Sequence, residues 1–340
     1  MAKIVQFGAI GGPDQLKLHE VEVAEPGPGQ VRIKIKAIGL NRAETLFRSG
    51  TYFEQPVLPA TNGYEGAGII DAIGPDVTDF AVGDAVSVAP AFSLNDYGFY
   101  ADTALAPVGA VIKHPAILSF DEAAAVWMAY LTAYDAFLEI AKVMPGEFVV
   151  IPAASSSVGI AAIQIVNMLG AVPIALTRTS AKRKLIENVG AAHVIATEEE
   201  DVVERLDVIT GGKGINVVLD PVGGPTFAKL LHAAAPRARF MLYGTIGEPT
   251  VLPHFPVFTK GLIITGELLF NTTFDVVKLK AGVEWISKGL ESGALKPVIA
   301  KTFPLEKIVE AHEYLESNQQ FGKIIVRPEI AERMAAVATA

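Results

Sequence analysis

Two kinds of hydrophobic pattern divide the chain. Between residues 1 and 115, short segments such as Val31–Ile38 alternate apolar and polar side chains with a period of two. This alternation is typical of strands with one buried face, and turns rich in Gly and Pro, such as Pro26–Gly29, separate the segments. Only one helix is expected here, at Ala43–Phe47. The pattern predicts a small β-barrel.

After Ser119 the chain has continuous apolar runs separated by helical segments. Ser119 and Glu122 have the spacing of a capping box, which predicts a helix that runs toward Tyr134 and beyond. Unbroken apolar runs are typical of parallel strands buried on both faces. Such runs cover residues 149–152, 172–176, 193–196, 217–219, 240–242 and 262–268. A helix over 280–292 and a last strand over 321–327 follow, and the last dozen residues are expected to form a loosely held tail.

The segment from Phe148 to Lys182 reads as a strand, a loop, a helix and a second strand. The loop Ala153–Gly159 consists of small residues and leads into the helix. Backbone N–H groups at such a helix N-terminus bind a pyrophosphate, and the end of the second strand meets the adenosine ribose. Only Gly159 remains of the three glycines of the ideal dinucleotide fingerprint, so the inference rests on this context. The alternative is a strand–helix–strand unit that binds nothing.

Positive charge follows the second strand. Where an NAD-binding chain usually places an Asp or Glu for the ribose diol, this chain has Arg178, Thr179 and Lys182. Cationic side chains suit a 2′-phosphate through charge-assisted hydrogen bonds. The sequence therefore favours NADP(H) over NAD(H), with these three residues as part of the cofactor site.

Composition excludes several classes of function. The chain has 340 residues, of which 51% are hydrophobic and 19% charged, and this predicts two globular domains. A net charge of −9 argues against a broad nucleic-acid surface, which needs clustered Lys and Arg. The longest apolar run, Ala123–Tyr134, is shorter than the roughly 18 residues that cross a bilayer, and no signal segment opens the chain. We expect a cytoplasmic protein with a small-molecule partner and neither nucleic-acid nor membrane partners.

The chain has no cysteine. Disulfides, thiolate nucleophiles and Cys-based zinc sites are therefore excluded. The six histidines are scattered, and no two have the i,i+4 spacing of a zinc-binding helix. A Gly-x-Ser-x-Gly elbow is also missing, which argues against serine hydrolysis. The sequence predicts no metal site.

Several separated motifs together resemble the quinone oxidoreductase branch of the medium-chain dehydrogenase/reductase superfamily, over the chain to about residue 327. The motifs are Asn41–Tyr52, Gly63–Gly68, Leu131–Tyr134, Ala153–Gly159, Asp220–Gly224, Tyr243–Gly244 and Gly322–Lys323. The resemblance implies an α/β fold with a GroES-like β-barrel catalytic domain, 1–121 and 298–340. A Rossmann domain with a doubly wound parallel sheet, 122–297, would bind NADP(H), with the active site in the cleft between the two domains. It also implies a homodimer, in which the strand Leu262–Leu269 pairs across a two-fold axis.

The resemblance implies a reaction without zinc. Zinc-dependent alcohol dehydrogenases of the same superfamily have a Cys before the barrel helix and a His in a Gly-His-Glu motif, where this chain has Tyr64. Without a metal to polarise an alcohol, the natural reaction is hydride transfer from NADPH to a quinone or an α,β-unsaturated carbonyl compound. The protein then has to position the two reactants and supply a proton.

Three residues are candidates on the substrate side. Tyr52 is the leading proton donor, because related enoyl thioester reductases look similar here and a phenol can protonate an enolate; the alternative is an aromatic that only lines the pocket. Asn41 resembles the amide that reaches the substrate oxygen or the nicotinamide, and the alternative is an Asn that caps a turn. Tyr64 is a further pocket candidate, with core packing as the alternative.

The resemblance adds cofactor-binding residues to the three after the second strand. They are Thr132 at the nicotinamide, Ser156, Ser157 and Val158 with backbone N–H groups for the pyrophosphate, Gly244 and Phe270 at the carboxyl edge of the sheet, and Lys323 in the terminal motif.

Two other functions stay open. An enoyl thioester reductase would need a basic groove for a carrier phosphopantetheine or CoA, and the barrel part shows only Arg42 and Arg48. A non-enzymatic NADPH-binding protein, a sensor or a crystallin-like structural protein, would bind NADPH without oxidising it.

Overall fold

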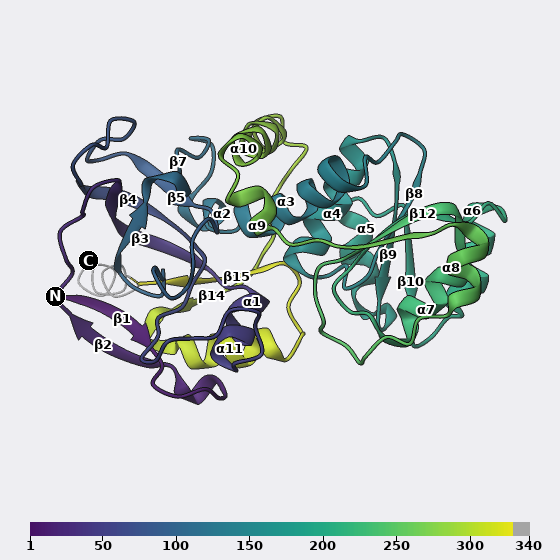
Figure 1. Cartoon of the computed structure of the whole chain (residues 1–340), viewed down its shortest axis with the longest axis horizontal. Helices are drawn as coiled ribbons and strands as arrows, with labels where there is room; N and C mark the ends of the chain where they lie inside the picture. Colours follow the sequence, from purple (N-terminus) through teal and green to yellow (C-terminus); the bar gives the residue numbers. More distant parts are fainter. Residues whose placement is uncertain (329–340) are drawn as a thin grey trace, which may run out of the picture. The chain divides into compact units, whose positions relative to one another are not determined.

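The computed structural model describes residues 1–328 and divides the chain into two compact units (Figure 1). Unit 1 comprises Met1–Met128, Thr273–Leu279 and the chain from Pro297; unit 2 comprises Ala129–Thr272 and Lys280–Lys296. The predicted domain division at 121/122 and 297/298 stays a prediction. Residues 329–340, which include the predicted tail, lie outside the described residues.

Unit 2 contains a six-stranded sheet in which all neighbouring strands are parallel, in the order β10-β9-β8-β11-β12-β13. The strands are β8 (Phe148–Ile151), β9 (Val172–Thr177), β10 (His193–Ala196), β11 (Ile215–Asp220), β12 (Ala234–Leu242) and β13 (Ile263–Gly266). Each predicted apolar run overlaps one of them. Such runs need cover on both faces, so their arrangement as a parallel sheet confirms the predicted architecture of this unit.

Helices alternate with these strands in the sequence. They are α4 (Ser157–Met168), α5 (Arg183–Asn188), α6 (Val202–Thr210), α7 (Gly224–His232), α8 (His254–Lys260), α9 (Phe270–Thr273) and α10 (Val276–Glu291). Leu206 of α6 and Phe227 of α7 pack with Val150, Ile174 and Val218 of the strands in one fully buried cluster. The short β–α connections bring the strand ends and helix starts together at the carboxyl edge of the sheet.

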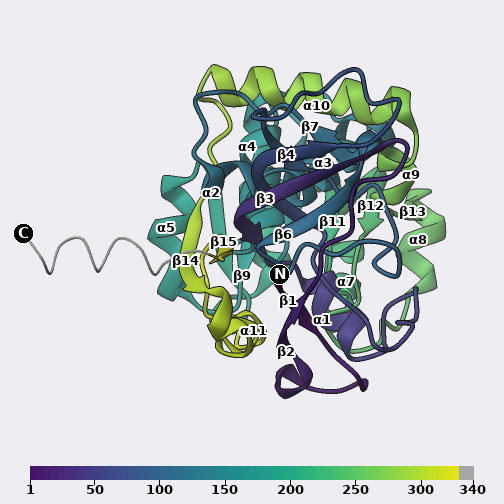
Figure 2. The same cartoon turned by 90° about the vertical axis from the view of Figure 1, so that its left-hand side faces the viewer.

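Unit 1 is built on a seven-stranded sheet, ordered β14-β15-β3-β4-β5-β7, with β6 also paired to β3 (Figures 1 and 2). The strands are β3 (Gln30–Gly39), β4 (Glu65–Ile73), β5 (Ala85–Val88), β6 (Thr103–Pro107), β7 (Val111–Ile112), β14 (Ile299–Pro304) and β15 (Lys323–Arg327); β1 (Ala2–Gln6) pairs with β2 (Lys17–Val21). Helices α1 (Arg42–Arg48), α2 (Phe120–Ala123) and α11 (Ile308–Glu316) and, within the described residues, three short 3₁₀ turns also belong to this unit. Pairing of β15 with β3 joins the C-terminal part of the chain to the N-terminal part.

The helix predicted from Ser119 through Tyr134 is not continuous, and that prediction was wrong. The Ser119 capping box is present, but α2 covers only Phe120–Ala123, and α3 begins at Trp127 and ends at Tyr134, followed by a π-helical turn. Tertiary contacts explain the break. The Trp127 indole donates to Ser87 Oγ at 2.6 Å, and the Met128 N–H donates to Glu65 Oε2 at 3.0 Å. Local helix propensity cannot predict this break, because the backbone N–H of Met128 donates to a buried carboxylate from a distant part of the chain.

Within residues 1–328 we find no helix with the length and apolar character required to traverse a bilayer. The predicted cytoplasmic location stays a prediction.

Candidate functional site

The loop between β8 and α4 has the geometry of an anion-binding helix start. Ser156 is the N-cap of α4, and its Oγ accepts a hydrogen bond from the Gly159 N–H at 3.0 Å. Helix geometry leaves the first-turn N–H groups, including those of Ser157 and Val158, without intrahelical acceptors. These donors and the helix dipole together suit a pyrophosphate.

Gly159 is required by close packing inside this loop. A Cβ atom at position 159 would lie 2.7 Å from the Ala153 carbonyl oxygen and 2.7 Å from the Ala154 Cα. Ala153 itself has a φ of 49°, so the loop already places an alanine in the left-handed region. The one glycine of the fingerprint that the sequence retains is therefore the one that lets helix and strand approach each other.

Lys182 lies beside this loop, and Arg178 is near enough to act on its charge. Lys182, in the 3₁₀ turn that follows β9, has its Nζ 3.4 Å from the Ser155 Oγ. Burial, and after it the positive charge of Arg178, lower the pKa of the Lys182 ammonium. Two neighbouring cations repel each other until an anion reduces their interaction, so this corner of the loop favours a bound phosphate. The positive charges of Lys182 and Arg178 therefore fit the 2′-phosphate of a phosphorylated dinucleotide.

Buried acidic groups, which sequence reasoning missed, lie at the carboxyl edge of the same sheet. Burial raises the pKa of the Tyr243 hydroxyl, and Asp220 and Glu267 add to the shift while a hydrogen bond with Ser156 opposes it. Tyr243 therefore supports the N-cap of α4 from the end of β12. Burial raises the pKa of Asp220 and, with the charge of Asp135, that of Glu267. The motifs contained Tyr243 and Asp220, but no local signal shows that strands far apart in sequence bring them together.

Two other predicted cofactor residues of unit 2, Gly244 and Phe270, follow strands at the same edge. Gly244 follows β12 and Tyr243, and a Cβ there would come within 3.0 Å of the Pro221 carbonyl oxygen. Phe270 begins α9 shortly after β13, and Thr132 lies on α3; both side chains are buried. Their contact with a nicotinamide stays a prediction.

Unit 1 contributes a pair of tyrosines. The rings of Tyr52 and Tyr64 have centroids 6.3 Å apart, and Tyr64 is fully buried. Burial raises the pKa of both hydroxyls, and each phenol also affects the pKa of the other. Both groups therefore stay protonated at neutral pH and can donate to a substrate oxygen. The structure brings these two predicted residues together.

The segment that carries Tyr52 is held by a neighbouring loop. Glu54 Oε1 accepts from Ser93 Oγ and, at 2.9 Å, from Asn95 Nδ2. Asn95 Oδ1 in turn accepts from the Val57 N–H at 2.8 Å. This set of bonds fixes the Tyr52 segment on both sides of the proline at position 56.

Asn41 and Lys323 are brought together as well, in a buried ion-pair cluster of unit 1. Lys323 Nζ forms an ion pair with Glu65 and donates to Asn41 Oδ1 at 2.6 Å. Asn41 Nδ2 donates to Glu65 Oε1 at 3.1 Å, and the Asn41 N–H donates to Glu44 Oε2 at 2.7 Å. These contacts give both side chains a structural role in joining β15, β4 and α1. Their predicted roles toward substrate and cofactor stay predictions.

Among residues 1–328 no three His, Cys, Asp or Glu side chains gather in a way that could hold a metal ion. The chemistry that the described residues offer is hydrogen bonding, anion binding and proton donation.

Comparisons with known proteins find likeness over nearly the whole chain. Residues 27–116 match the family described as alcohol dehydrogenase GroES-like domain, and residues 189–326 match the family described as zinc-binding dehydrogenase. The human quinone oxidoreductase is 34% identical over 96% of this chain and 98% of its own length. The 2-haloacrylate reductase of a Burkholderia species is 32% identical over 94% of this chain and 97% of its own length.

A solved structure shows the same likeness in three dimensions. The crystal structure of Escherichia coli quinone oxidoreductase complexed with NADPH superposes with a TM-score of 0.89 and 31% identity. The match covers 96% of this chain and 100% of that chain. This likeness confirms the predicted fold class, a GroES-like part and a Rossmann part.

Proposed function

The chain belongs to the zinc-independent quinone oxidoreductase branch of the medium-chain dehydrogenase/reductase superfamily, and from this premise we propose that it reduces quinones or α,β-unsaturated carbonyl compounds with NADPH. The observation that carries the cofactor part is the position of Lys182 beside Ser155 of the phosphate loop, where the charge of Arg178 acts on it. The human and Escherichia coli relatives that carry the quinone oxidoreductase name, the latter solved with NADPH, support the same choice.

The residues of unit 2 would hold the cofactor. The N–H groups of Ser157 and Val158 would bind the pyrophosphate, with Ser156 fixing the helix start. Arg178 and Lys182, with Thr179 between them, would bind the 2′-phosphate. Bound NADPH supplies a hydride to the substrate, and Thr132, Gly244 and Phe270 are the residues we assign to its nicotinamide end.

The residues of unit 1 would serve the substrate. Reduction of an unsaturated carbonyl compound adds a hydride at one carbon and leaves an enolate that needs a proton. Tyr52 would donate that proton from its hydroxyl, and the neighbouring Tyr64, whose ring centroid lies 6.3 Å away, would orient it. The sequence has no cysteine to bind zinc, so we assign activation of the substrate to hydrogen bonding.

We predict that Tyr52→Phe lowers kcat for an enone by about 10²-fold or more, the usual contribution of a general acid, and leaves the NADPH Kd unchanged. The effect on a quinone is expected to be much smaller, because a hydroquinone anion takes its proton from water. Steady-state kinetics with both substrates measure the difference. The matched control is Tyr97→Phe, whose hydroxyl accepts from Gln30 Nε2 at 2.8 Å and lies outside the phenol pair. Equal kinetics of Tyr52→Phe and Tyr97→Phe on the enone would assign Tyr52 to pocket lining.

We propose that the protein is a homodimer that forms through the edge of the parallel sheet. Strand β13 lies at one of the two edges of the sheet, and Ile263 on it is 48% exposed. Just before it, Phe255 and Phe258 on α8 are 72% and 71% exposed and form an edge-to-face ring pair with centroids 5.6 Å apart. An exposed aromatic pair beside an open sheet edge is typical of an association surface.

The dimer predicts a simple result in analytical ultracentrifugation. Phe255→Glu with Phe258→Glu is expected to convert the sedimenting species from dimer to monomer, since two charges would have to be buried without partners. The control, Val276→Glu with Val277→Glu, changes two similarly exposed side chains elsewhere and is expected to leave the dimer intact. A wild-type protein that sediments as a monomer would refute the proposal.

A further inference from the structure

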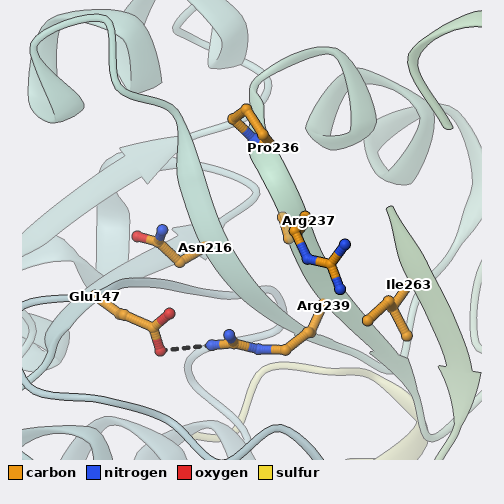
Figure 3. Close-up of a pocket in the computed structure, with 7 residues that line it drawn as sticks. Glu147, Asn216, Pro236, Arg237, Arg239 and Ile263 are labelled. Carbon is orange, nitrogen blue, oxygen red and sulfur yellow. Dashed lines mark hydrogen bonds and ion pairs between the residues drawn. The ribbon is translucent and has the colours of Figure 1, made fainter. Parts of the chain in front are cut away.

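A polar pocket lies at the edge of the parallel sheet opposite the phosphate loop. Strand β8 runs from Phe148 at this edge to Ile151, which leads into the phosphate loop, so the two sites are at opposite ends of one strand. The pocket has a volume of about 370 Å³, the size of a small-molecule site (Figure 3). Its lining residues are Glu147, Asn216, Pro236, Arg237, Ala238, Arg239 and Ile263.

The pocket is rich in hydrogen-bond donors. Arg239 forms an ion pair with Glu147 at 2.5 Å through its Nη2, while its buried Nε has no hydrogen-bond partner in the described part of the chain (Figure 3). Asn216 Oδ1 accepts from the Phe148 N–H at 2.9 Å, which leaves its amide NH₂ as a donor. No ion pair within residues 1–328 includes Arg237. The pocket therefore has more hydrogen-bond donors than its single carboxylate, that of Glu147, can accept from.

The backbone places Arg237 at the pocket by a strained conformation. Between the pairs Ile215–Ala234 and Val217–Arg239, strand β12 contains a bulge that has no counterpart in β11. Arg237 lies in this bulge with a φ of 62°, in the left-handed region where glycine is favoured. A β-bulge re-aims a side chain, and strained residues of this kind cluster at ligand sites.

We propose that this pocket is an anion site that binds the phosphate group of a small phosphate monoester. Arg237 would give the monodentate or bidentate contact of a planar guanidinium, and Arg239 Nε and Asn216 Nδ2 would bind the remaining oxygens. The site is separate from the proposed cofactor site, since its residues come from the amino ends of β8, β11 and β13 and from the bulge of β12.

Isothermal titration of the full-length protein with inorganic phosphate tests the site. We expect saturable binding by the wild type and a Kd at least tenfold higher for Arg237→Gly. Glycine fits a φ of 62°, so this variant should unfold at the same temperature as the wild type or a higher one, which separates lost binding from lost folding. Arg178→Ala with Lys182→Ala removes the second place at which inorganic phosphate can bind, beside the phosphate loop, and is expected to keep the phosphate binding that Arg237→Gly loses.

The outcomes are distinct. Unchanged binding by Arg237→Gly, or binding lost only in the Arg178→Ala/Lys182→Ala variant, would place the anion elsewhere and overturn the proposal. An absence of saturable binding by the wild type would overturn it too. Succinate that binds more tightly than phosphate at Arg237 would replace the phosphate assignment by a dicarboxylate. Because none of these results depends on reductase activity, failure here leaves the proposed function untouched.

Discussion

Replacement of both Arg178 and Lys182 by alanine is expected to weaken NADPH binding by about 100-fold or more, while NADH binding changes little. Each charge-assisted hydrogen bond contributes about 1.5–3 kcal/mol, and the 2′-phosphate is the only group that distinguishes the two cofactors. The Lys182 ammonium lies 3.4 Å from Ser155 in the phosphate loop, so its loss acts at the cofactor site itself. Titration followed by cofactor fluorescence gives both dissociation constants.

The control for this prediction is Lys184→Ala. Lys184 is near in sequence, its side chain is 82% exposed, and its one ion pair, with Glu187, spans 3.5 Å. We expect it to bind NADPH like the wild type. A double variant that loses NADPH and NADH equally would mean that the two cations support the loop without recognising the 2′-phosphate.

The second large effect concerns stability. Lys323→Met is expected to lower the free energy of unfolding by about 3–5 kcal/mol, because it leaves the Glu65 carboxylate buried without its counter-ion. The two side chains are 1% and 0% exposed, so water cannot replace the ammonium. Adding Glu65→Gln to Lys323→Met is expected to restore part of the loss, since a neutral amide costs less to bury. Denaturant unfolding monitored by tryptophan fluorescence measures the change.

An exposed ion pair gives the matched comparison for Lys323. Lys3 and Glu306 pair at 2.7 Å with side chains that are 42% and 47% exposed, so Lys3→Met is expected to leave the unfolding midpoint nearly unchanged. If Lys323→Met unfolds like the wild type but no longer binds NADPH, Lys323 belongs to the cofactor site and its structural role is refuted.

The sequence predicted the parallel sheet well because the signal is local. The run His193–Ala196 is apolar after its first residue and lies between two helices, and the strand there has the predicted bounds. Gly159 was also identifiable, since a phosphate loop needs a close backbone approach at a fixed place. The choice of Tyr52 and of Tyr64 as candidates came from a resemblance, and only the structure shows that their ring centroids lie 6.3 Å apart.

What could not be predicted depends on contacts between distant segments. Glu44 is fully buried and accepts from Tyr64 N–H at 2.8 Å and from Tyr100 Oη at 2.6 Å, and Tyr100 Oη lies 2.9 Å from His312 Nε2. An isolated glutamate in an amphipathic helix has the pattern of a surface residue. The bonds of Asn41 to Glu65 and Lys323 have the same character, because these partners lie on two distant strands, β4 and β15.

The most direct test of the proposed function is the fate of the hydride. The protein is incubated with NADPH deuterated at C4 and an enone, and the product is examined by mass spectrometry and NMR. The account predicts one deuterium at the β-carbon of the saturated product and a proton from water, passed through Tyr52, at the α-carbon. Bound NADPH that no quinone oxidises, together with no deuterium in any enone product, would contradict it and identify a nucleotide-binding protein without reductase activity.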